Sequence, residues 1–192
     1  MKIIKILKIN NGETILAGSP HGRILLAQLI GQVTQEKVAT PLFVDFAGIE
    51  VATGSFLRTA ILGFRDYCIT AELYLIPIAT NLTEEMVEEM NLILEAKGDA
   101  MLSCNLDQEN QIYNAQILGK LEEKQLITLN TVLQEREVNA VDLEKKYWSQ
   151  EKIKATGWNN RLNSLVMKGI LFEIKRGRQK FYRPVLEVEY GK

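Results

Sequence analysis

Residues 41–57 read PLFVDFAGIEVATGSFL, and the fold of the first part of the chain can be inferred outward from this stretch. Its beginning, through Val51, is mostly apolar, which is typical of a buried central strand. Gly54 and Ser55 then open a helix, because apolar residues recur at helical spacing from Phe56 onward. A strand that leads into a helix is the repeating unit of an α/β fold.

The residues before this stretch predict two strands and a helix. Residues 2–9 and 13–17 are β-rich, and Asn10-Asn11-Gly12 between them predicts a hairpin, because Asn and Gly accept the positive φ of a tight turn. Ser19 is expected to cap the following helix, which has Pro20 at its first position.

The residues after it continue the alternation. A strand is predicted at 72–78, a helix capped by Thr83 ends near Lys97-Gly98, and strands follow at 101–106 and 111–118. The order is ββαβαβαββ, which implies crossover connections. We therefore expect an α/β domain over residues 1–119, with a central, mostly parallel or mixed sheet covered by helices.

The second part of the chain, residues 120–192, has a different pattern. Helices are predicted at 125–135, after a cap at Asn139, and after a cap at Thr156. A hairpin follows at 171–183, with its turn at Arg176-Gly177-Arg178. Three short helices followed by a hairpin is the order of a winged helix-turn-helix domain.

The charges of the two parts have opposite sign. The whole chain is nearly balanced, with 23 Lys and Arg, 24 Asp and Glu and a formal net charge of −1. Residues 1–119 carry eight basic and 14 acidic side chains, whereas residues 120–192 carry 15 and ten. This asymmetry predicts an anionic partner for the second part.

The third predicted helix of the second part has an amide-rich face opposite its apolar one. Trp158, Leu162 and Leu165 share the apolar side, whereas Asn160, Asn163, Ser164 and Met167 share the other. Asparagine can hydrogen-bond an adenine edge, and a helix N-terminus can lie against phosphate. The residues expected to contact DNA here are Lys154, Thr156, Asn159, Asn160, Arg161 and Asn163. The alternative is a solvated polar face.

The predicted hairpin carries a cluster of cations. Lys175, Arg176, Arg178 and Lys180 surround Gly177 and are expected to contact phosphates or a minor groove. The alternative is a basic hairpin that serves solubility or edge protection.

Both parts resemble known families. Residues 155–171, ATGWNNRLNSLVMKGIL, together with KRGR at 175–178, resemble a prokaryotic winged-helix DNA-binding domain over residues 128–184. Residues 44–57 and TILAGS at 14–19 resemble the STAS-like domain of unknown function, over roughly residues 1–117. That family is related to the STAS domain of sulfate transporters and anti-sigma-factor antagonists. In the antagonists the turn reads Asp-Ser, and a partner kinase phosphorylates that Ser.

The turn of this chain differs from the antagonist pattern. The corresponding positions are Thr53 and Gly54, with Ser55 one place later, so Ser55 is expected to be a helix cap or, alternatively, a phosphorylation site. Asp45 lies inside an apolar strand and must be hydrogen-bonded or paired there, either at a binding edge or as a structural cap. Asp45, Thr53 and Ser55 are therefore the candidate partner-binding or switch residues.

The sequence contains no motif typical of a metal site, a catalytic triad or a phosphate-binding loop. Cys68 and Cys104 have no CxxC spacing, and both are expected to be buried. The single histidine, His21, forms no recognisable triad with Ser55 and Asp45, and there is no phosphate loop. We therefore expect no enzyme activity, no cofactor and no metal. No apolar run reaches the ~18 residues of a membrane span, and we expect a cytoplasmic protein.

The sequence thus predicts a transcriptional regulator whose second part binds double-stranded DNA. The STAS-like part is expected to sense a small ligand, bind a partner protein or bind its own copy, and a homodimer on paired half-sites is left open. The alternative is a non-enzymatic partner-switching module, in which the winged helix is a docking platform for proteins.

Overall fold

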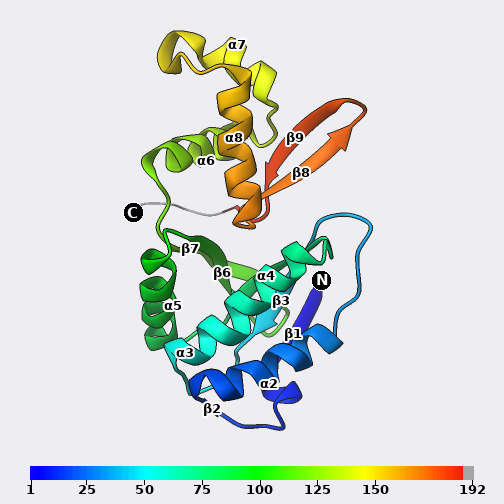
Figure 1. The fold of residues 1–192 in the computed structure, drawn as a ribbon, viewed down its shortest axis with the longest axis vertical. Helices are drawn as coiled ribbons and strands as arrows, with labels where there is room; N and C mark the ends of the chain where they lie inside the picture. Colours follow the sequence, from blue (N-terminus) through cyan, green and yellow to red (C-terminus); the bar gives the residue numbers. More distant parts are fainter. Residues whose placement is uncertain (188–192) are drawn as a thin grey trace. The chain divides into compact units, whose positions relative to one another are not determined.

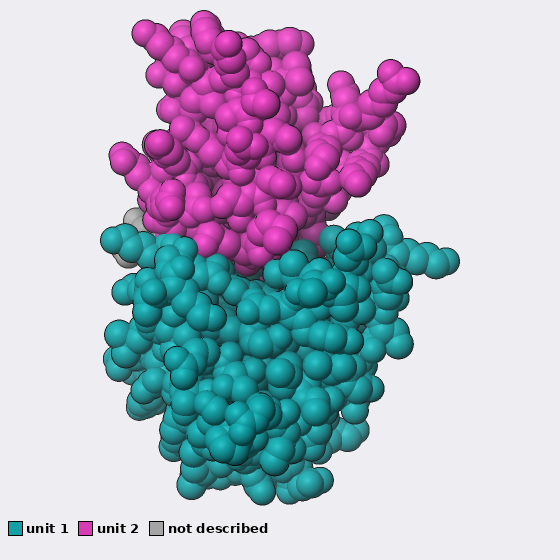
Figure 2. Space-filling view, viewed as in Figure 1, with its two compact units in different colours: residues 1–120, 188–192 teal, residues 121–187 magenta. Residues whose placement is uncertain are grey.

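The computed structural model describes residues 1–187, and these form two compact units, residues 1–120 and 121–187, coloured separately in Figure 2. Residues 188–192 of the predicted second domain lie outside the described residues.

The first unit is built on a five-stranded sheet (Figure 1). Its strands, in spatial order, are β1 (Lys2–Lys5), β3 (Thr40–Asp45), β5 (Leu75–Thr80), β6 (Ala100–Leu106) and β7 (Ile112–Gly119). The first four are parallel, and β7 pairs antiparallel with β6. The predicted α/β fold with a mixed, mostly parallel central sheet is confirmed.

The helices of this unit share one apolar core with the sheet. They are α2 (Gly18–Gly31), α3 (Gly54–Leu57), α4 (Gly63–Thr70) and α5 (Glu84–Ala96), and a π-helical turn, η1 (Arg58–Leu62), joins α3 to α4. Leu25, Phe56 and Met90 from these helices are fully buried in one cluster with Val44 and Met101 of the strands. In Figure 1, α2, α3 and α4 pass in front of the strands. Burying a side chain of this size contributes ~1.5–3 kcal/mol, so this cluster holds the helices on the sheet.

Helix α5 begins and ends as its sequence predicts. The Thr83 hydroxyl accepts a hydrogen bond from the backbone N–H of Met86 at 3.3 Å, and Gly98 takes a positive φ of 62° after the last turn. Both terminal predictions are confirmed, because each depends only on residues adjacent in the chain.

The predicted hairpin over residues 2–17 is wrong. Strand β1 ends at Lys5, and a short helix, α1 (Ile6–Ile9), follows it. Strand β2 (Ile15–Leu16) instead pairs parallel with β4 (Val51–Ala52). Asn11 and Gly12 do adopt positive φ, but they reverse the chain after α1. Strand β1 forms its backbone hydrogen bonds with β3, and Ile6 is fully buried in the core. Tertiary pairing therefore overrides the local turn signal.

The two edges of the sheet differ in composition. Strand β1 carries exposed Lys2 and Lys5, whereas the eight residues of β7 include no charged side chain. The pairing of β7 with β6 is interrupted between Ser103 and Asn105, where Asn114 takes a φ of 49°. Charges and bulges are the two common ways in which proteins block an open edge, and each edge here has one of them.

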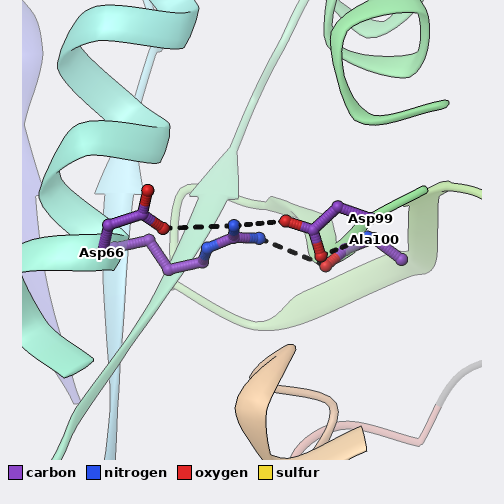
Figure 3. A network of polar contacts seen from close by, with 4 residues as sticks. Asp66, Asp99 and Ala100 are labelled. Atoms are coloured by element: carbon purple, nitrogen blue, oxygen red, sulfur yellow. Dashed lines mark hydrogen bonds and ion pairs between the residues drawn. The ribbon is translucent and has the colours of Figure 1, made fainter. Parts of the chain in front are cut away.

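A buried arginine connects α4 to the start of β6 (Figure 3). Arg65 is 6% exposed, and its Nη1 donates to the carbonyl oxygen of Ala100 at 3.3 Å. Its Nη2 donates to Oδ2 of Asp99 at 2.5 Å and lies 3.3 Å from Oδ1 of Asp66. The guanidinium therefore joins elements that are 34 residues apart in the chain.

Both cysteines are buried, as expected, and this has a measurable consequence. Burial raises the pKa of the Cys68 thiol to about 12 and that of Cys104 to about 11. The thiolate is the reactive form, so at pH 8 we expect each thiol of the folded protein to react with Ellman's reagent more slowly than a free cysteine by at least ~100-fold. In the denatured protein, two thiols per chain should react with the reagent at the rate of a free cysteine. Rapid reaction of either thiol in the folded protein would contradict this prediction.

The second unit contains three helices and a two-stranded antiparallel sheet. The elements are α6 (Glu123–Glu135), α7 (Ala140–Glu151), α8 (Ala155–Met167), β8 (Leu171–Arg176) and β9 (Gln179–Pro184). Trp158, Leu162 and Leu165 of α8 are fully buried, as their spacing predicts. The predicted cap at Asn139 is confirmed, since its Oδ1 accepts from the backbone N–H of Asp142 at 2.9 Å.

Three other predicted caps are wrong. Ser19, Ser55 and Thr156 each lie one or two residues inside their helices, which begin after Ala17, Thr53 and Lys154 respectively. The first amides of two of these helices use distant acceptors. The N–H of Gly18 donates to Oγ1 of Thr53 at 3.0 Å, and the N–H of Ala155 donates to a carboxylate oxygen of Glu144 at 2.8 Å. A nearby hydroxyl is therefore not needed at these ends.

Candidate nucleic-acid interface

A cleft of about 300 Å³ lies in the second unit, where α7 and α8 begin and the β8–β9 hairpin turns. The cleft takes residues from all three elements, and the residues that line it are Asn139, Ala140, Val141, Ala155, Thr156, Asn159, Arg178, Gln179 and Lys180. None of them is acidic, and two are cations. These cations suit the cleft to an anionic ligand, while the first amide of α8 is already bonded to the carboxylate of Glu144 and the first turn of α7 carries Asp142.

A second, smaller cleft of the same unit has the opposite character. It measures about 210 Å³, and its lining includes the carboxylates of Glu135, Glu137 and Asp142. Lys146 and Tyr147 both donate to Oε1 of Glu135, and these hydrogen bonds lower the pKa of that carboxyl group. Asn139 lines both clefts, so the acidic cleft adjoins the first one. Glu144 and Glu173 also bond to Ala155 and Lys180 of the first cleft's lining.

Four of the predicted DNA-contacting residues of α8 have accessible side chains. Lys154, Thr156, Asn160 and Asn163 are exposed, and Thr156 also lines the cleft. Asn159 is half-buried and lines the cleft as well, while its Oδ1 accepts a hydrogen bond from the Tyr182 hydroxyl at 2.6 Å. Accessible amide groups therefore extend along α8 from the cleft.

Two residues of α8 are placed differently from the sequence prediction. Arg161 is half-buried, with its guanidinium 5.8 Å from the centre of the Trp158 ring and its Nη1 buried without a hydrogen-bond partner within residues 1–187. Ser164 was expected on the outward face, but its hydroxyl accepts from Nε2 of Gln125 at 2.6 Å. The position of Ser164 is therefore a correction: its side chain faces helix α6, while Asn160 and Asn163 stay exposed.

The cations of the hairpin fall into two groups. Lys175 and Arg178 are exposed, and no acidic partner for either occurs in the described part of the chain. Arg176 instead makes two hydrogen bonds to the carboxylate of Glu137, at 2.7 and 2.8 Å, and lies 4.8 Å from the centre of the Phe181 ring. Lys180 is paired with Glu173 at 2.8 Å. Arg183 of β9 is also exposed and has no acidic partner among the described residues, so the uncompensated charge of the hairpin is that of Lys175, Arg178 and Arg183.

Asp45, a candidate switch residue of the first unit, is 5% exposed, and one of its carboxylate oxygens accepts two hydrogen bonds within this unit. Its Oδ1 accepts from the backbone N–H of Ala47 at 2.9 Å and from Nδ2 of Asn81 at 2.7 Å. Oδ1 of Asn81 in turn accepts from the N–H of Leu106 at 2.9 Å. Asp45 thus ties together the ends of β3, β5 and β6.

The other two candidate switch residues lie together at the starts of α2 and α3. Oγ1 of Thr53 accepts from the N–H of Gly18 and is 3.3 Å from Oγ of Ser55. The carbonyl oxygen of Ser55 accepts from the hydroxyl of Thr59 at 2.8 Å. Both side chains are half-buried, and the hydrogen bonds of Asp45 go elsewhere, so the three residues do not form one site.

Sequence reasoning missed two residues that shape the cleft region. Tyr182 holds Asn159, and Glu137 holds Arg176, across 23 and 39 residues of chain. Burial, with the nearby Glu173 charge, raises the pKa of Tyr182 to about 12. The sequence predicts only that Tyr182 lies in a β-strand. No spacing of residues indicates that its side chain contacts Asn159.

Within residues 1–187 no three His, Cys, Asp or Glu side chains come together in a way that could hold a metal ion. No helix in the same range has both the length and the apolar character needed to cross a membrane. Comparisons of the chain with protein-family models, with curated proteins and with solved structures find no match.

Proposed function

We propose that this protein binds double-stranded DNA through residues 121–187, which we interpret as a winged helix, and that it acts as a transcriptional regulator. The observation that supports this proposal is the acid-free cleft between the starts of α7 and α8 and the cationic hairpin. Three helices followed by an antiparallel hairpin is also the element order of that fold.

In the proposed complex, α8 lies in the major groove. Asn159, Asn160 and Asn163 reach base edges, while Lys154 and Thr156 at the start of the helix contact phosphate oxygens. Lys175 and Arg178 of the hairpin, which have no acidic partner among the described residues, contact the neighbouring backbone. Arg176 contributes less, because Glu137 already neutralises it.

The first unit is proposed to be the regulatory, STAS-like part of the protein. The hydroxyl cluster of Thr53 and Ser55 at two helix starts is where a partner or small ligand is expected to act. The rival proposal is a non-enzymatic docking module, which is favoured by the exposure of Trp148 (47%) and Met167 (55%) in the second unit.

The test of DNA binding is a double substitution, Lys175→Ala with Arg178→Ala. Removing two phosphate contacts should reduce the salt slope of binding by about 2 and the affinity for mixed duplex DNA by about tenfold or more at 100 mM salt. Fluorescence anisotropy over a salt series measures both quantities.

The control has the same change in net charge. Lys124→Ala with Lys145→Ala removes two exposed cations that do not line the cleft, and it should leave both quantities near their wild-type values. Equal effects of the two double variants, or no salt-dependent binding by the wild-type protein, would overturn the proposal in favour of the docking module.

A further inference from the structure

We infer that Tyr182 is a specificity-determining residue that acts through Asn159: it holds the Asn159 carboxamide so that only the NH2 group faces the cleft, and the cleft therefore selects guanine over adenine at one base position. This inference rests on the proposed function. It names the base chemistry that this part of the interface would recognise.

Tyr182 is fixed at both its backbone and its side chain. Its N–H donates to the carbonyl oxygen of Val138 at 2.8 Å, and its carbonyl oxygen accepts from the N–H of Val138 at 3.0 Å. The residue is 0% exposed, and its hydroxyl donates to Oδ1 of Asn159 at 2.6 Å. The phenol thus has one position, and Asn159 has an anchored oxygen.

The buried hydroxyl needs an acceptor and keeps its proton. A buried donor without a partner costs ~1–3 kcal/mol, so Tyr182 and Oδ1 of Asn159 stay together. Because the pKa of Tyr182 is raised to about 12, the phenol remains a donor at every physiological pH. The carboxamide oxygen therefore faces the interior, which leaves Nδ2 as the group available to the cleft that Asn159 lines.

A carboxamide that offers only hydrogens discriminates between purines. The major-groove edge of guanine has two adjacent acceptors, O6 and N7, whereas adenine has one acceptor and one donor. The familiar pairing of Asn with adenine needs both the oxygen and the NH2 group. With its oxygen held by Tyr182, the Asn159 NH2 group can donate to either O6 or N7 of guanine, whereas adenine offers it only N7 beside a competing N6 donor.

The rest of the cleft and the neighbouring asparagines agree with this assignment. Arg178, Lys180 and Thr156 also offer donors, and no carboxylate lines the cleft. Asn160 and Asn163 are exposed, and within residues 1–187 neither side chain makes a hydrogen bond with the protein. The carboxamide oxygen and the NH2 group of both residues are therefore free, and only Asn159 has its oxygen held by another side chain.

The experiment compares base preferences of Tyr182→Phe, which removes the hydroxyl and keeps the ring, with those of the wild-type protein. The preferred duplex is first selected from a random pool, and each guanine of that site is then replaced by adenine in competition assays. The wild-type protein should prefer guanine by about tenfold or more at one position. Tyr182→Phe should reduce that ratio to about two or less, because the freed carboxamide can turn to offer its oxygen to adenine.

Two further variants locate the effect. Asn159→Ala should abolish the preference at the same position, whereas Asn163→Ala should alter a different one. A purely structural loss would lower affinity at all positions together without changing the guanine-to-adenine ratio. Independently of DNA, the side-chain NH2 resonances of Asn159 should shift in Tyr182→Phe, while those of Asn160 and Asn163 stay in place.

The outcomes separate this inference from the proposed function. If Tyr182→Phe binds DNA with the wild-type ratio at every guanine, or if the Asn159 resonances do not move, the inference is wrong and DNA binding stands. If the wild-type protein binds no duplex at low salt, the proposed function fails and the base preference fails with it.

Discussion

Replacing Arg65 by alanine is expected to lower the free energy of unfolding of the first unit by about 3–5 kcal/mol, because it breaks a buried ion pair and removes its packing. The guanidinium donates hydrogen bonds to the carboxylate of Asp99 and to the carbonyl oxygen of Ala100 (Figure 3). Arg65 is only 6% exposed, so once its side chain is shortened, water can hardly replace the hydrogen bonds that Asp99 and Ala100 lose. A loss of this size is a large part of the stability of an ordinary domain.

The stability of the first unit can be measured by urea unfolding, because the tryptophans are not in that unit. Both tryptophans, Trp148 and Trp158, belong to the second unit, so tryptophan fluorescence follows that unit alone during urea unfolding, and the remaining change in far-UV circular dichroism is assigned to the first unit. Asp66→Asn is the matched control, because the Asp66 side chain is 57% exposed and its contact with Arg65 is the longer one. It should change the stability by less than about 1 kcal/mol. An Arg65→Ala midpoint equal to that of the control would contradict the prediction.

Replacing Trp158 by alanine is expected to destabilise the second unit by about 3–5 kcal/mol. Trp158 is 0% exposed and is among the largest fully buried side chains of the chain. Its ring lies 6.2 Å from that of Tyr147 and 5.8 Å below the guanidinium of Arg161, so its loss leaves a cavity between α7 and α8. A small unit has few other buried side chains to compensate for it.

Amide hydrogen exchange in α8 and β9 measures this loss directly. Faster exchange throughout both elements is expected in Trp158→Ala, since they share one core. The control is Trp148→Ala, which removes an indole that is 47% exposed and should change stability by about 0.5 kcal/mol or less. Wild-type protection in Trp158→Ala would show that the ring does not hold these elements together.

The parts of the fold that sequence reasoning predicted well depend on neighbouring residues. The caps at Thr83 and Asn139 are local, and the buried positions of α8 follow from helical spacing alone. The failure at residues 2–17 has the opposite origin. Strand β1 pairs with β3, about 40 residues later, and nothing in the local Asn-Gly signal reports that competition.

The candidate site shows the same division. The exposure of Asn160, Asn163 and Arg178 agrees with their predicted faces. Arg176 could not be distinguished from Arg178 by sequence, because the carboxylate that neutralises it, Glu137, precedes it by 39 residues. The orientation of Asn159 depends on Tyr182 in the same non-local way, and a residue's chemistry at a site depends on such partners as much as on its own type.

The unequal edges of the central sheet limit how copies of this chain could polymerise. Two chains that joined through β7 would form one continuous sheet with a β1 strand at each outer end. Both ends would then expose Lys5, whose charge disfavours the addition of a third chain, while Lys2 is paired with Glu36. Growth by strand addition beyond a pair is thus disfavoured at the β1 edge.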